Sequence, residues 1–261
     1  MYSESTKKTI LLFLLMSVFM GVMAKNYPTM KGYVNFLKKE YHTPLKGPEI
    51  IQVSSNLSKK EIETVNKSAA SAVRIISRDQ SGMVAASTGT VFTHDDIFYV
   101  ITVAHGIVGD CSTTIIWSGK SNFTPCLSII AIDREADYSI MIIDEPPGVN
   151  AVDLMSVLPR RKQWSKSVSL QNKIFYTGFP NSIGPLTISG RVVGLTDINY
   201  IFVHSYAWSG SSGSGVFSSD GKFIGVVMAV DVGQTIYGVD VLEDMVVVLP
   251  SSRIDWSSIL F

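Results

Sequence analysis

Beyond residue 70 the sequence consists mainly of short runs of β-branched and aromatic residues, and Gly, Pro, Asn, Asp or Ser separates most of them. The runs are AVRIIS, GTVFT, IFYVITVA, TTIIW, LSIIAI, YSIMII, KIFYTGF, LTISGRVVG, YIFVHS and FIGVVMAV. Many short strands with turn residues between them are typical of a β-sandwich or β-barrel rather than of βαβ units. The pattern therefore predicts an all-β fold.

Helical patterns lie at the two ends of this region. The segment SKKEIETVNKSAASAV opens with Ser58 and Glu61, which have the spacing of a capping box, and it predicts a helix. Before it, MKGYVNFLKKEYH predicts a short amphipathic helix that Pro44 and Pro48 then break. After the last strand, RIDWSSILF predicts a terminal helix packed against the strands.

Residues 9–24 form an uninterrupted apolar segment that follows Lys7 and Lys8. The segment is shorter than the ~20 residues that span a bilayer comfortably, and Val22 and Ala24 suit a signal-peptidase site. Two interpretations stay open, a cleaved signal peptide and an uncleaved signal anchor. Either one places the rest of the chain outside the cytoplasm, secreted, periplasmic or anchored, with membrane association through residues 9–24 in the second case.

Composition and charge exclude several classes of function. The chain has 22 basic and 22 acidic residues without a Lys/Arg block, so we expect no nucleic-acid partner. Its two cysteines, Cys111 and Cys126, stand in no CxxC or Cys/His cluster, so we expect no metal site. A disulfide between them and two buried free thiols are both compatible with the sequence.

The stretch WSGSSGSGVF, residues 208–217, is rich in Ser and Gly, but it lies between two apolar strands. A linker should separate domains, so a tight turn that presents one serine is the better interpretation. A serine hydroxyl becomes a nucleophile when a histidine held by a carboxylate takes its proton. The chain offers four histidines: His42, His94, His105 and His204.

His105 is the best candidate base because it follows the buried strand FYVITVA directly, which gives the imidazole a rigid support. Asp137 is the best candidate carboxylate, since it stands at the start of the apolar strand YSIMII and a buried charge needs a partner. Asp133 and Glu135 belong to a more polar loop. No histidine follows Ser212, which excludes the Ser–Asp–His order of α/β-hydrolases.

Three motifs in this order resemble the trypsin-like serine peptidases. TVAHG resembles their TAAH signature, ADYSIMII their D-L-A-L-L segment, and GSSGSGVF their GNSGGPVF turn. YTGFPNSIGPLTISGRVVG is similar to the HtrA/Deg-like branch, and we expect no PDZ domain after it. The resemblance covers roughly residues 70–245. Ser214 and Gly215 depart from it, because they replace the usual Gly-Pro.

This resemblance implies a chymotrypsin-like double β-barrel over residues 70–261, with a boundary near 150–170, preceded by the hydrophobic segment 1–24 and a helical and irregular extension, 25–69. It implies a serine endopeptidase in which His105 is the base, Asp137 orients it, and Ser212 attacks the peptide bond. The N–H groups of Gly210 and Ser212 would form the oxyanion hole. No cofactor or metal is required, and the partner is a protein or peptide substrate.

The resemblance also gives a substrate pocket and leaves two alternatives for the function. Tyr206 would lie at the base of the primary pocket, with Val227, Met228 and Ala229 as a wall, which favours an apolar or small residue before the cleaved bond. Ser214 is the alternative nucleophile, but Ser rather than Gly precedes it by two positions. A catalytically inactive peptide-binding barrel and an esterase with the same triad are the other functions that the sequence allows.

Overall fold

The computed structural model describes residues 56–118, 123–196, 200–235 and 238–260. The hydrophobic segment 1–24, most of the extension 25–69 and His42 therefore lie outside the described residues. The helices are α3 (Lys59–Ser71), α4 (Leu154–Val157), α5 (Arg161–Ser167) and α6 (Ser257–Leu260). Short 3₁₀ turns are η1 (Ala104–Gly106), η2 (Cys111–Thr113), η3 (Pro180–Ser182) and η4 (Ser251–Arg253).

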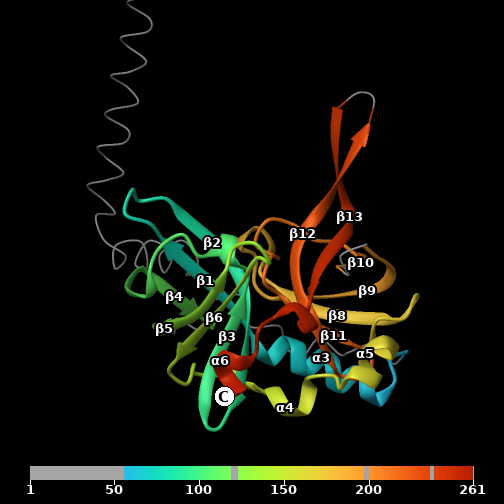
Figure 1. Ribbon diagram of the computed structural model, residues 1–261, viewed down its shortest axis with the longest axis horizontal. Coiled ribbons are helices and arrows are strands. Elements are labelled where there is room, and N and C mark those ends of the chain that lie inside the picture. The colour runs from blue at the N-terminus through green and yellow to red at the C-terminus, as the bar shows by residue number, and fades with distance from the viewer. Residues whose placement is uncertain (1–55, 119–122, 197–199, 236–237, 261) are drawn as a thin grey trace, which may run out of the picture. The chain divides into compact units, whose positions relative to one another are not determined.

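The strands form two closed sheets, which are coloured from teal to green and from yellow to red in Figure 1. In the first sheet the order β1-β4-β5-β6-β3-β2 is closed by pairing of β1 with β2, and β7 adds to β2 in parallel. Its strands are β1 (Ala72–Arg78), β2 (Val84–His94), β3 (Ile97–Thr102), β4 (Thr114–Trp117), β5 (Phe123–Asp133), β6 (Tyr138–Ile143) and β7 (Val152–Asp153).

The second barrel has the order β10-β13-β12-β11-β8-β9, and pairing of β9 with β10 closes it. Its strands are β8 (Lys173–Gly178), β9 (Leu186–Leu195), β10 (Ile201–His204), β11 (Gly215–Ser218), β12 (Phe223–Thr235) and β13 (Gly238–Pro250). In Figure 1 the hairpin of β12 and β13 extends beyond the barrel. This architecture confirms the predicted all-β, chymotrypsin-like double barrel.

Each barrel has its own apolar interior, and a third cluster joins them. Residues of the first barrel, such as Phe92 and Ile140, pack with residues of the second, such as Phe217 and Phe223. The rings of Phe92 and Phe223 pack edge to face, with their centroids 4.9 Å apart. Because the rings and aliphatic side chains at the joint are buried, this cluster fixes the two barrels against each other.

Helix α3 confirms the prediction made from Ser58 and Glu61. The Ser58 hydroxyl accepts from the Glu61 N–H, and the Glu61 carboxylate accepts from the Ser58 N–H, so both halves of the capping box are present. The helix packs on β8, β9 and β11 of the second barrel and on β2 of the first. Its buried face is polar, and Ser68 bonds to Thr177 of β8 at 2.9 Å.

Cys111 and Cys126 form a disulfide, which decides between the two states that the sequence allowed. The bond ties η2 to β5 in the first barrel. Disulfides persist in oxidising compartments and are rare in the cytoplasm. The disulfide is therefore consistent with a location of the protein outside the cytoplasm. Among the helices that the structure describes, none is long and apolar enough to cross a membrane.

Loss of this disulfide should destabilise the first barrel. The cysteines are 15 positions apart, and closing a loop of that size in the unfolded chain is worth about 3 kcal/mol. We expect the double substitution Cys111→Ser and Cys126→Ser to lower the free energy of unfolding by roughly that amount, measured by urea denaturation. Reduction of the native protein should have the same effect, and equal midpoints with and without reductant would contradict the assignment.

Candidate active site

The topology of the first barrel brings His105 and Asp137 together. Strand β3 ends at Thr102, which pairs with Ser139 near the beginning of the antiparallel strand β6. His105 follows the end of β3 in the turn η1, and Asp137 directly precedes β6. Two residues 32 positions apart thus lie side by side at one end of a strand pair.

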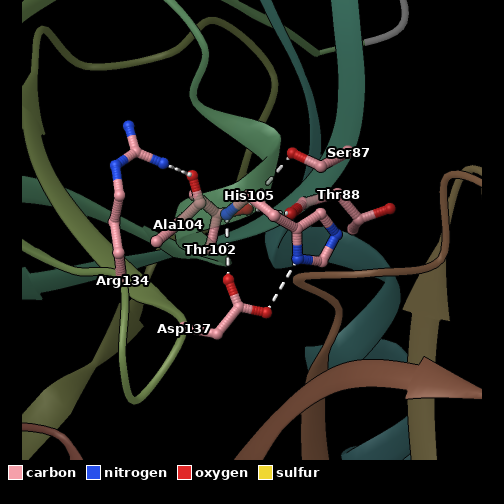
Figure 2. A network of polar contacts seen from close by, with 7 residues as sticks. All are labelled: Ser87, Thr88, Thr102, Ala104, His105, Arg134 and Asp137. Carbon is pink, nitrogen blue, oxygen red and sulfur yellow. Dashed lines mark hydrogen bonds and ion pairs between the residues drawn. The ribbon is translucent and has the colours of Figure 1, made fainter.

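Asp137 binds the histidine with both carboxylate oxygens, as Figure 2 shows. Oδ1 accepts from the backbone N–H of His105 at 2.9 Å, and Oδ2 lies 2.7 Å from Nδ1 of the ring. The Asp137 side chain is 19% exposed, whereas the His105 side chain is 53% exposed. The carboxylate is therefore mostly shielded, while the ring reaches solvent.

The backbone before Asp137 is shaped by its own loop. Asp133 Oδ1 accepts from the N–H groups of Glu135 and Ala136 at 2.9 and 2.8 Å, which closes a tight turn. Asp137 itself has φ 65, a left-handed conformation that Asp adopts more readily than bulkier residues. This turn is what aims the Asp137 carboxylate at His105 instead of along the strand.

Arg134, in the same loop, holds the histidine turn from a second side. In Figure 2 its guanidinium reaches the carbonyl of Ala104. Nη1 donates to Ala104 O at 3.0 Å and Nη2 donates to Ile107 O at 2.9 Å, so the two bonds bracket His105. Arg134 could not be singled out from the residue pattern, because its acceptors are main-chain atoms of a distant segment.

The four serines of the turn 208–217 have different environments. The Ser211 and Ser214 side chains are buried: Ser211 Oγ accepts from the Trp208 N–H, and Ser214 Oγ donates to Ser211 O at 2.7 Å. Ser209 is exposed, and Ser212 is partly exposed. A buried hydroxyl that already donates a hydrogen bond is a poor nucleophile, so these environments favour Ser212 over Ser214.

Two glycines allow the turn its shape. Gly210 has φ +93 and Gly213 has φ +88, which other residues rarely adopt. A Cβ on Gly213 would lie 2.0 Å from the carbonyl oxygen of Thr88, and one on Gly210 would lie 2.5 Å from Phe179 O. Within the described part of the chain, the N–H groups of Gly210 and Ser212 donate to no protein acceptor.

Thr88 of β2 connects this turn to the first barrel. Its N–H donates to Ser212 O at 2.8 Å, and its hydroxyl donates to Gly210 O at 2.7 Å. Its carbonyl accepts from the Thr102 hydroxyl at 2.6 Å, three residues before His105. One residue therefore contacts both the serine turn and the support of the histidine. Among the described residues, no hydrogen bond joins Ser212 Oγ to the His105 ring; without substrate, such bonds are often long.

The predicted pocket residues lie beside the serine turn, although Tyr206 is not enclosed. Val227 is buried in β12, where its carbonyl accepts from Gly213 N and its N–H donates to Ser214 O. Met228 is partly buried, and Ala229 pairs with Val247 of β13. Tyr206 is 55% exposed. Its ring stacks on that of Trp208, with the ring centroids 6.1 Å apart and the planes at 11°. This partner was not predicted from the sequence.

The two other histidines that the structure describes, His94 and His204, have different surroundings. His94 lines a surface cavity of about 700 Å³ at the β2–β3 hairpin, together with carboxylates that include Asp95, Asp96 and Glu145. His204 faces Asp244 at 3.7 Å, and both side chains are exposed. In the part of the chain that the structure describes, no group of three or more His, Cys, Asp or Glu residues could hold a metal ion.

Tyr176 lies behind Tyr206 in the second barrel, and its buried hydroxyl donates to Tyr206 O and lies 3.3 Å from Ser205 Oγ. Burial raises the pKa of Tyr176 from 10.0 to about 12. A raised pKa means that the folded state disfavours the phenolate. The resulting stabilisation is fully present below pH 10 and is lost as the pH rises toward 12.

We expect the free energy of unfolding to fall by about 3 kcal/mol over this alkaline range, since one pKa unit corresponds to about 1.4 kcal/mol. Denaturant titrations at stepped pH values measure the decline. Tyr176→Phe removes the titrating hydroxyl, so its stability should decline less steeply above pH 10. Parallel curves for the two proteins would show that Tyr176 is not the group responsible.

Comparison with known proteins supports the double-barrel fold. The model of the trypsin-like peptidase domain family matches residues 87–226, a range that includes His105, Asp137 and Ser212. No curated protein sequence matches the chain. The serine endoprotease from Yersinia pestis is structurally similar, with a TM-score of 0.56 and 16% identity. That alignment covers 75% of this chain and 64% of the Yersinia chain, less than two thirds of its length.

The active form of the Rv3671c protease from M. tuberculosis is similar to the same extent. Its TM-score is 0.55 at 17% identity, and the alignment covers 72% of this chain and 79% of that protein. At such low identity, these two structures support the double-barrel fold and carry no further information about activity.

Proposed function

Because the chain belongs to the trypsin-like peptidase domain family, we propose that it is a serine endopeptidase that cleaves protein substrates with His105, Asp137 and Ser212. The observation that carries the proposal is the pair of hydrogen bonds by which Asp137 binds the main chain and the ring of His105. In a purely structural role, a partly exposed histidine would not need a shielded carboxylate aimed at its Nδ1.

In the proposed reaction, Nε2 of His105 takes the proton of Ser212 Oγ as the oxygen attacks the peptide carbonyl. Asp137 keeps Nδ1 protonated and stabilises the imidazolium that forms. His105 then gives the proton to the leaving amine, and water releases the acyl group from Ser212 in a second, equivalent cycle. The reaction needs no metal or organic cofactor.

Among the described residues the N–H groups of Gly210 and Ser212 have no acceptor, which supports an oxyanion hole at this turn. Negative charge develops on the carbonyl oxygen of the substrate when Ser212 attacks it, and donors that are already oriented stabilise this charge without rearrangement. Both N–H groups belong to the turn that Thr88 ties to the first barrel. The turn would therefore supply the nucleophile and the oxyanion donors together.

For the substrate, we propose an apolar or small residue before the cleaved bond, next to Tyr206, Val227, Met228 and Ala229. Basic specificity would need an acidic side chain where Tyr206 stands, and the exposed Tyr206–Trp208 stack suits an apolar group. Within the family we place the chain with the HtrA/Deg-like protease domains, on the G-x-P segment at Gly178–Pro180 and the following strand β9.

We also propose the domain order of a signal peptide or anchor at 1–24, an extension at 25–69, and the peptidase at 70–261. The support is the apolar segment after Lys7 and Lys8 and the disulfide in the first barrel. Both observations support a peptidase domain on the non-cytoplasmic side of a membrane.

Hydrolysis of a fluorescently labelled, unfolded protein tests the proposal. We expect the native chain to release labelled peptides, and pretreatment with a serine-directed fluorophosphonate to stop the release. An esterase with the same triad would hydrolyse a small activated ester but not the labelled protein. A peptide-binding barrel without catalysis would bind the labelled protein, cleave neither substrate and react with no probe.

A further inference from the structure

Ser214 is one of the two positions at which the serine turn departs from the resemblance to trypsin-like peptidases, where glycine is usual. Its side chain is completely buried, and its hydroxyl donates to Ser211 O at 2.7 Å. Its own N–H donates to the same oxygen at 3.1 Å. A Cβ on Gly178 would lie 2.4 Å from the Ser214 hydroxyl, so glycine at the end of β8 leaves the space that this hydroxyl fills.

The acceptor of these bonds belongs to the peptide unit that carries the Ser212 N–H. A peptide unit is planar and trans, so its C=O and N–H point in opposite directions. Holding Ser211 O from the buried side therefore turns the Ser212 N–H away from the core. The peptide unit two positions earlier is also held by its carbonyl, because the Asn181 N–H donates to Ser209 O at 2.6 Å and so orients the Gly210 N–H.

We infer that Ser214 is a positioning residue that fixes the Ser212 N–H as an oxyanion donor. The inference rests on the proposed function and deepens it. In relatives with glycine at this position, only the backbone N–H could hold the Ser211 carbonyl. Here the hydroxyl supplies a second bond to that oxygen, which restrains rotation of the peptide unit during attack. A fixed donor stabilises the developing oxyanion more than a donor that must reorient.

The experiment compares Ser214→Ala, Ser214→Gly and the matched control Ser218→Ala. Ser218 is also a buried serine of this region, but its hydroxyl bonds to Asp220 and Lys222 at the β11–β12 turn. Complete loss of an oxyanion donor costs about 10²–10³ in kcat, and loosening one should cost less, about tenfold. We therefore expect both Ser214 variants to lose about tenfold in kcat with KM within about twofold of the native value.

A second readout separates positioning from general damage to the fold. A peptide aldehyde reacts with the Ser212 hydroxyl to form a tetrahedral adduct that carries an oxyanion, as the transition state does. The affinity for the aldehyde should therefore fall in the Ser214 variants by the same factor as kcat. Ser218→Ala should keep the native kcat, KM and aldehyde affinity, and thermal unfolding confirms that each variant is folded. If Ser214→Ala does not fold, Ser214→Gly provides the same test, since it also removes the hydroxyl.

The outcomes distinguish this inference from the proposed function. Native kcat and aldehyde affinity in the folded Ser214 variants would overturn the role of Ser214 and leave the peptidase intact. A rise in KM of about tenfold without loss of kcat would also overturn it, because the defect would then lie in substrate binding. A native chain that cleaves no peptide would refute the proposed function and this inference together.

Discussion

Ser212→Ala is expected to lower kcat for peptide hydrolysis by roughly 10⁴- to 10⁶-fold while the protein remains folded. The loss is large because the two nearest hydroxyls of the turn cannot replace the nucleophile: Ser211 and Ser214 are buried, and the Ser214 hydroxyl already donates to Ser211 O. The alanine variant retains the Gly210 and Ser212 N–H groups, so substrate binding should change little. Steady-state hydrolysis of a fluorogenic peptide measures the effect.

Ser214→Ala is the comparison variant for this prediction, since it retains the Ser212 hydroxyl. Its activity should stay within about tenfold of the native value, as expected for a loosened oxyanion donor. The reverse result, an active Ser212 variant and an inactive Ser214 variant, would show that the nucleophile is Ser214 and that the register of the turn is wrong.

Asp137→Asn should reduce kcat by roughly 10⁴-fold without unfolding the chain. Both oxygens of Asp137 accept hydrogen bonds, one from the His105 N–H and one at Nδ1. Asparagine has one acceptor oxygen and one NH₂ group, so the NH₂ group must face one of these two partners. If it faces the ring, the imidazole takes the tautomer with its proton on Nε2 and cannot accept the proton of Ser212.

The matched control for Asp137→Asn is Asp133→Asn in the same loop. A single oxygen of Asp133 accepts from Glu135 N and Ala136 N, and asparagine retains such an oxygen. The control should therefore keep the loop conformation and kcat within about twofold of native. Comparable losses in the two variants would mean that the loop, and not the charge of Asp137, limits the rate.

The pattern of short apolar runs was sufficient to predict an all-β fold, because apolar runs and the turn residues between them mark each strand locally. The double barrel itself was implied by the resemblance to trypsin-like peptidases. The pair of His105 and Asp137 was also predictable. A histidine directly after one buried strand and a carboxylate directly before another are local signals, and antiparallel pairing of β3 with β6 brings such positions together. The capping box of α3 was predictable for the same reason, since all its bonds lie within four residues.

The contacts that hold the site in place were not predictable. Arg134 bonds to the carbonyls of Ala104 and Ile107, and Thr88 bonds to the main chain of Gly210 and Ser212. Main-chain acceptors leave no trace in residue types, so only the folded geometry reveals them. The same holds for Cys111 and Cys126, whose spacing alone allowed free thiols as well as the disulfide.

The central claim, that Ser212 is a nucleophile activated by His105, is tested most directly by finding where a fluorophosphonate reacts. Native protein is labelled, digested and sequenced by mass spectrometry, alongside His105→Ala. The account predicts one phosphonylated residue, Ser212, in the native chain and at least 10³-fold slower labelling in the His105 variant. Labelling at another serine, or equal labelling rates in the two proteins, would contradict it.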